Sequence, residues 1–155
     1  MTHWRMQLHP NEPGEAVRHT VESLAAGYIG LDFSVDVGDL HRTTKDQLPG
    51  HMKDYWAFAH EMAVDDRVLI VVHHFPFALA AVAGDYNYIR VPAHEIGVWF
   101  RHFRQVKDVR FYGDFKTNVH QWERTTMTDT ISPLRDTSSI SYRLIEEWSE
   151  QIPVG

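Results

Sequence analysis

The sequence predicts an α+β fold in which a small curved β-sheet or barrel is flanked by helices. Residues 56–63 place apolar side chains at helical spacing, and residues 64–72 then form a nearly unbroken run rich in β-branched residues. A further strand is expected over residues 77–83, before a glycine turn. A helix that runs into a hairpin, with separate strands on either side of it in the chain, is typical of the α+β class.

The first third of the chain is expected to alternate strand and helix. Residues 3–8 (HWRMQL) alternate apolar and polar side chains as a strand does. Residues 15–26 carry apolar side chains at helical spacing, and Gly27 stands where a helix C-terminus favours glycine. Residues 28–33 (YIGLDF) form the next expected strand, and a polar, turn-rich segment over residues 42–50 follows.

The remaining elements follow from turn signals and periodicity. Two aspartates at residues 65–66 are expected to turn the chain from the helix into its strand, and residues 73–76 connect that strand to the next. Residues 97–112 indicate a long strand in which aromatic and basic residues alternate. Residues 125–136 are expected to be irregular or briefly helical, and residues 141–150 to form a short terminal helix.

Length and composition limit the classes of protein to consider. A chain of 155 residues with 43% hydrophobic content fits one domain over residues 1–155. The absence of cysteine excludes disulfides, thiolate nucleophiles and cysteine zinc sites. The formal charge of −6 argues against a wholly electrostatic nucleic-acid binder, so any such surface must be local. We expect a cytoplasmic protein without membrane contact, because no apolar run approaches about 18 residues and residues 1–10 do not form a signal peptide.

The order of several short segments resembles the EVE-like branch of the PUA superfamily. The segments are a strand that begins near Trp4, a helix that ends in AAGYIGLDF, an acidic GDL, FAHEMAVDDRVLIVV, AAVAGDYNY and RHFRQVKDVRF. This branch is related to the YTH readers of methylated RNA and to specificity domains of modification-dependent restriction endonucleases. The resemblance covers about residues 3–112 and leaves residues 113–155 as a C-terminal extension.

The resemblance implies a small barrel that holds a flipped or single-stranded modified base in an aromatic pocket. The partner would be DNA or RNA with a modified base. The chain would then be a reader that performs no chemistry, with the nuclease of a restriction system on a separate subunit or domain. Where relatives often have Ile-Gly-Trp, this chain has Ile29-Gly30-Leu31-Asp32-Phe33, so Phe33 would supply the aromatic wall. The segment over residues 41–53 is also short, so the modification that is read can differ.

A flipped base needs aromatic walls and hydrogen-bonding groups for its Watson–Crick edge. The candidate walls are Phe33, Tyr55, Trp56 and Trp99. Asp32 and Ser34 follow on the same strand end and could accept from an exocyclic amine. The alternative is that the rings fill the core and the polar residues form a turn. Gly30 is expected to allow close approach by a ligand or by neighbouring backbone.

The densest basic stretch supplies the candidate phosphate contacts. It contains Arg101, His102, Arg104, Lys107 and Arg110, interleaved with phenylalanines, and the first four are the candidate contacts. Adjacent residues of a strand point to opposite faces, so these charges cannot all face one way unless the strand bends. Some of them are therefore expected to be structural.

Neither a metal site nor a catalytic motif is apparent in the sequence. The HEMAV segment has Val64 where an H-E-x-x-H motif requires histidine, and there is no G-x-S-x-G or P-loop. We therefore expect a binding protein without metal or cofactor. The alternative is a small-molecule or nucleotide-binding protein, or an enzyme, that uses the same pocket.

Overall fold

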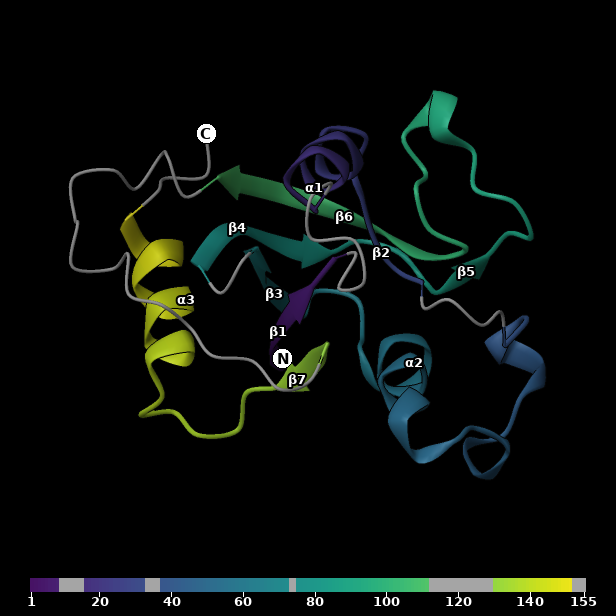
Figure 1. Ribbon diagram of the computed structural model, residues 1–155. Helices are drawn as coiled ribbons and strands as arrows, with labels where there is room; N and C mark the ends of the chain where they lie inside the picture. The colour runs from purple at the N-terminus through teal and green to yellow at the C-terminus, as the bar shows by residue number, and fades with distance from the viewer. Residues whose placement is uncertain (9–15, 33–36, 73–74, 112–129, 152–155) are drawn as a thin grey trace.

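Seven strands form one mixed sheet in the computed structural model, which describes residues 1–8, 16–32, 37–72, 75–111 and 130–151 (Figure 1). The strands are β1 (His3–Gln7), β2 (Tyr28–Leu31), β3 (Arg67–Val72), β4 (Phe75–Val82), β5 (Asn87–Tyr88), β6 (His102–Phe111) and β7 (Ile131–Pro133). The sheet order is β2-β6-β4-β3-β1-β7, and β5 pairs with β6 beside this path. The helices are α1 (Ala16–Ala25), α2 (Lys53–Trp56) and α3 (Ile140–Gln151), and α2 continues as a π-helix over Ala57–Glu61.

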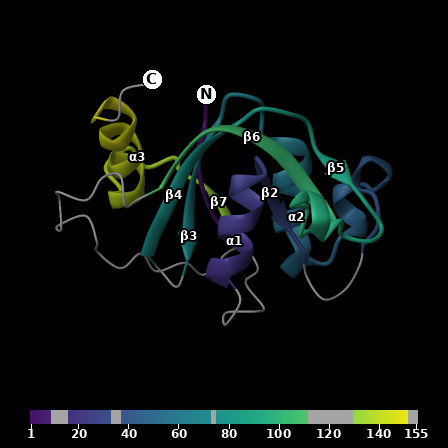
Figure 2. The same cartoon turned by 90° about the horizontal axis from the view of Figure 1, so that it is seen from above.

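The sheet is strongly curled, with long β6 arching across it (Figure 2). β1 and β3 pair in parallel, and every other strand pair is antiparallel. α3 lies on one side of the sheet and α2 on the other (Figure 2). These features confirm the predicted α+β class and the predicted curved sheet, which β2, β3, β4 and β6 share.

Each face of the central strands has its own core, because successive strand residues point to opposite sides. Met6, Val68, Ile70, Ala78 and Val82 are buried on the concave side with the residues of α2 and the π-helix. The opposite face carries the β3 and β4 residues that pack with α3, and this second cluster contains Leu69, Val71, Leu79, Leu144, Ile145 and Trp148. A run that is buried on both faces explains why residues 68–72 are apolar throughout.

The predicted turn between helix and hairpin is confirmed at Asp65 and Asp66. Asp65 adopts a positive φ of 75°, and Asp66 is buried. The Asp66 carboxylate accepts from the backbone N–H of Thr2 and Ala63 and from Trp4 Nε1, each at 2.9 Å. Asp66 therefore ties the start of β1 to the turn that leads into β3.

The C-terminus of α1 also agrees with the prediction. Gly27 follows the helix with φ 88°, a left-handed conformation that favours glycine, and its N–H donates to the Leu24 carbonyl. The next strand, β2, begins directly afterwards at Tyr28.

Several expected elements and boundaries differ from the structure. Residues 131–133 lie in a segment expected to be irregular or helical, but they form β7, because Ile131 pairs with Met6 and Pro133 with Trp4. β6 begins at His102 rather than at residue 97, since a 3-10 helix over His94–Ile96 ends in a left-handed Gly97. β4 begins at Phe75 rather than at residue 77.

Candidate functional site

An ion pair stands where β2 ends beside the start of β6. Leu31 pairs with His102, so Asp32 and Arg101 are adjacent on neighbouring strands. Arg101 Nη2 lies 2.6 Å from Asp32 Oδ1, and Arg101 Nε donates to the same oxygen at 2.8 Å. The two side chains are 19% and 15% exposed, so a small part of the pair is accessible to solvent.

Three tyrosine rings surround His102 next to this ion pair. His102 is fully buried, and the centroid of Tyr55 lies 4.5 Å from its ring. The Tyr86 ring stacks on it at 5.8 Å, and the Tyr88 ring lies at 5.1 Å. We call these four residues the His102 cluster. The pairing of β5 with β6 and the packing of α2 bring the cluster together.

A hydrogen-bond chain orients the polar atoms of the His102 cluster. The backbone N–H of Leu40 donates to the Tyr86 hydroxyl at 3.2 Å, and this hydroxyl lies 2.6 Å from His102 Nδ1. Burial raises the pKa of Tyr86 above its ordinary value, and the charge of Asp39 adds to the effect, so the hydroxyl keeps its proton. We therefore assign the Tyr86 O–H as the donor to Nδ1, which places the imidazole proton on Nε2.

A partly exposed ring stack lies beside the cluster on α2 and the π-helix. The rings of Trp56 and His60 stack at 3.9 Å with an interplanar angle of 28°. His60 Nε2 lies 2.9 Å from the carbonyl oxygen of Leu40, to which it donates. Leu40 thus connects the stack to Tyr86. Trp56 is half-buried and His60 is exposed, so flat aromatic surface is accessible here.

The structure brings together four of the residues singled out from the sequence, whereas Trp99 lies apart from them. Asp32, Tyr55, Arg101 and His102 meet at the β2 end, and Trp56 follows Tyr55 directly on α2. Phe33 and Ser34 lie outside the described residues. The Trp99 ring instead stacks between His19 at 4.3 Å and His94 at 4.2 Å, on the side of α1.

Arg104 and His102 lie in the core, which corrects their expected position at a phosphate-binding surface. Arg104 is 2% exposed, and it donates to the carbonyls of Phe58, Met62 and Gly84. Burial lowers the pKa of Arg104, an effect that the charges of Asp85 and Asp66 oppose. Its guanidinium is used to hold the π-helix and the turn after β4 against β6.

Lys107 is exposed, but its side chain forms an ion pair with Asp65. Its Nζ lies 2.6 Å from Asp65 Oδ1, and this hydrogen bond raises the pKa of Lys107.

Gly30 does permit a close approach, but by a side chain rather than by a ligand. A Cβ at position 30 would lie 2.2 Å from Cδ2 of Phe100.

Sequence reasoning missed Tyr86 and Tyr88 as members of the cluster. Both stand in the AAVAGDYNY segment, whose pattern contributed only to the family resemblance. The available signal was the pair of tyrosines directly after a glycine turn, because such residues begin the next element beside the strand that has just ended.

The described part of the chain contains neither a metal-binding group of side chains nor a membrane-spanning helix. No three His, Asp or Glu residues gather there in a group that could hold a metal ion. None of the described helices has the length and apolar character to cross a membrane.

No family model matches this sequence, and no curated protein matches it. Among solved structures, the chain is similar to the MmI1 YTH domain with a TM-score of 0.49 and 10% identity, over 98% of this chain and 100% of that one. It is also similar to the YTH domain of the Zygosaccharomyces rouxii MRB1 protein in complex with N6-methyladenosine RNA. That TM-score is 0.47 at 13% identity, over 98% of this chain and 88% of that one. At these values neither likeness assigns an activity to the chain.

Proposed function

We propose that this chain is a nucleic-acid reader that holds one unstacked, modified base at the end of β2. The observation that carries the proposal is the convergence there of a partly exposed carboxylate–guanidinium pair, Asp32 and Arg101, with the His102 cluster. A base needs hydrogen-bonding groups at its edge and flat apolar surface at its faces. Both are supplied at this strand end.

The chemistry of the site suits a base edge. A carboxylate accepts an N–H of the Watson–Crick edge, and a guanidinium donates to a ring nitrogen or carbonyl. Half-buried Trp56, beside the cluster, and half-buried Tyr88, within it, offer aromatic surface. A methyl group on the base would be stabilised against such surface, because it buries apolar area there.

Phosphate contacts near this site fall to cations other than Arg104. Arg42, Lys53 and Arg90 are exposed, and none forms an ion pair with another described residue. Each stands two positions from Leu40, Tyr55 or Tyr88, so the three come from three separate segments that contribute to the site. In a chain of net charge −6, such a local group is the surface that phosphates would meet.

The family resemblance refines the proposal. The resemblance implies that residues 1–155 form one EVE/PUA-like domain, which acts in the cytoplasm without a cofactor. It serves as the specificity module of a modification-dependent restriction system, and a separate nuclease subunit or domain cuts the nucleic acid.

The test is a titration of short labelled oligonucleotides at two salt concentrations. The panel contains single- and double-stranded DNA and RNA, each with and without methylated bases. We expect one methylated oligonucleotide to bind about fourfold tighter than its unmodified match, because burial of one methyl-sized group contributes about 0.8 kcal/mol. Equal affinity for all members would overturn the reader function. Binding of free nucleotides without binding of oligonucleotides would favour the small-molecule alternative.

A further inference from the structure

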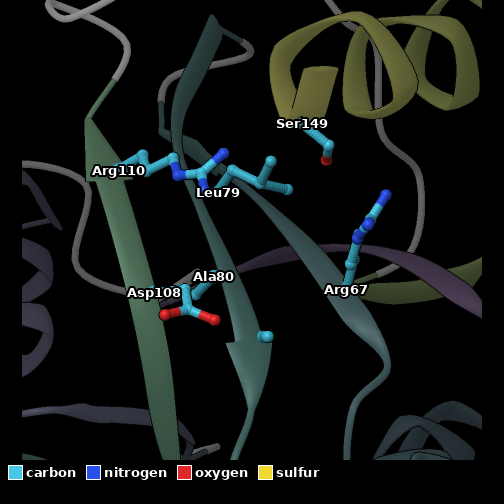
Figure 3. A pocket seen from close by; sticks show the side chains of 7 residues that line it. Arg67, Leu79, Ala80, Asp108, Arg110 and Ser149 are labelled. Atoms are coloured by element: carbon cyan, nitrogen blue, oxygen red, sulfur yellow. The ribbon is translucent and has the colours of Figure 1, made fainter. Parts of the chain in front are cut away.

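The face of the sheet that packs against α3 contains a pocket on the opposite side from the concave core. It has a volume of about 110 Å³ and is lined by Arg67, Arg110, Asp108, Ser149 and residues 79–81 (Figure 3). Arg67 belongs to β3, Arg110 to β6 and Ser149 to α3, with β4 as the floor between them (Figure 3).

The sheet register explains why two arginines flank this pocket. Arg67 pairs with Ala81, and Arg110 pairs with Leu79. Directly paired residues share a face, and Leu79 faces the α3 side, so both arginines project there. The β4–β6 register shifts between Leu79 and Ala81, near Asp108 with its positive φ of 53°. Such a bulge redirects side chains, and the small side chain of Ala81 leaves space between the arginines.

The charges of the two arginines are incompletely balanced. Arg110 is half-buried and has no hydrogen bond or ion pair from its side chain to the described residues. Arg67 Nη1 lies 3.9 Å from Glu146 Oε1, and the same oxygen also bonds His3 Nε2. A partly buried guanidinium without a close anion loses hydration free energy that a bound oxyanion would restore.

We propose that this pocket binds one phosphate group. Guanidinium forks from the two sides match the oxygens of a phosphate, and the Ser149 hydroxyl can donate to a third oxygen. The space suffices, because one water needs only about 10–15 Å³. Asp108 is exposed and lies at the other end of the pocket from Ser149 (Figure 3), where water screens its charge. The phosphate comes either from a small molecule or from the end of a nucleic-acid strand.

Calorimetric titration of the full chain with inorganic phosphate at constant ionic strength tests the pocket. We expect saturable binding, which Arg110→Ala weakens about tenfold or more. Arg143→Ala removes the same charge from an exposed position of α3 outside the pocket, and we expect it to bind phosphate as the unchanged chain does. Ala81→Leu keeps every charge but fills the floor, and it should also remove binding. Absence of binding by the unchanged chain, or equal weakening by Arg143→Ala, would overturn the proposal.

A second titration identifies the source of the phosphate and does not depend on the reader function. It compares one unmodified oligonucleotide with a 5′-phosphate or a 5′-hydroxyl end. A preference for the 5′-phosphate that disappears in Arg110→Ala assigns the pocket to strand ends. Arg110-dependent binding of inorganic phosphate alone assigns it to small phosphates. Preference for methylated bases should be unchanged in Arg110→Ala, so failure of one proposal leaves the other measurable. Thermal unfolding in chloride buffer shows that each variant is folded.

Discussion

The ring of Phe100 packs directly on Gly30, so that a Cβ at position 30 would lie 2.2 Å from its Cδ2 and 2.3 Å from its Cγ. Phe100 is fully buried and cannot move aside into solvent. This contact fixes the middle of β2 against the segment that leads into β6, one residue away from the strand end at which we place the base.

Gly30→Ala should therefore lower the free energy of unfolding by about 1–3 kcal/mol, the usual effect of overpacking a core. Gly50→Ala is the matched control, because a Cβ at position 50 would meet no atom within 4 Å beyond its chain neighbours. We expect that control to change stability by less than about 0.5 kcal/mol. Denaturant unfolding of both variants makes the measurement, and similar stabilities would contradict the contact.

Trp56→Ala and Trp99→Ala separate the site from its surroundings. Both tryptophans are half-buried and both stack on histidine, but only Trp56 lies beside the His102 cluster. Trp56→Ala should weaken binding of the preferred methylated oligonucleotide by about 1–3 kcal/mol, the contribution of one stacking surface. Trp99→Ala should leave the affinity of the folded protein unchanged. The reverse pattern would move the site to the side of α1.

Replacement of Arg104 should lower stability, whereas replacement of Arg42 should change only the salt dependence of binding. Arg104→Met removes donors from three carbonyl groups and should lower the free energy of unfolding by about 3 kcal/mol or more, since each buried polar group left unsatisfied costs about 1–3 kcal/mol. Arg42→Ala should leave stability unchanged within about 0.5 kcal/mol. It should reduce the slope of log K against log salt by about 0.7–0.9, as expected for one lost phosphate contact. A reduced salt slope in folded Arg104→Met would contradict this assignment.

Tyr86→Phe should destabilise the fold by about 1–3 kcal/mol at neutral pH, because it removes the acceptor of Leu40 N–H and the donor to His102 Nδ1. The difference from the unchanged protein should shrink as the pH rises above about 10, the ordinary pKa of tyrosine. Above that pH the unfolded chain loses the proton that the folded chain keeps, since the folded-state pKa is raised, and stability falls.

Unfolding free energies of both proteins from neutral to alkaline pH measure this effect. The ultraviolet absorbance of tyrosinate follows the titration directly. A constant difference between the two proteins across the range would show that Tyr86 ionises as readily in the fold as in the open chain.

The local sequence pattern was sufficient to predict several elements. The apolar run over residues 68–72, the turn at Asp65 and the left-handed Gly27 were all predicted, because each follows from the residues of one short segment. β7 was missed for the opposite reason. Its three residues are too few to show a period and include Pro133, and its strand conformation depends on pairing with β1.

The site was only partly predictable, because alternation along a strand does not say which face is buried. Arg104 and Lys107 are equally basic in the sequence, yet one lies in the core and the other at the surface. Trp56 and Trp99 are likewise equivalent as isolated aromatic residues. Their different surroundings depend on His60 from the same helix and on His19 from α1, which are contacts that only the folded chain defines.

The position of β1 between β3 and β7 has a consequence for synthesis on the ribosome. Trp4 is made well before its partner across the β1–β7 edge, Pro133, because the two residues lie far apart in the sequence. Until then the hydrogen-bonding groups of β1 on that side have no strand to pair with, and an open strand edge invites pairing with other nascent chains. The short strand β7 thus pairs with this edge of β1 only late in folding. Slow elongation through residues 112–130 would lengthen the period in which the unpaired edge can aggregate.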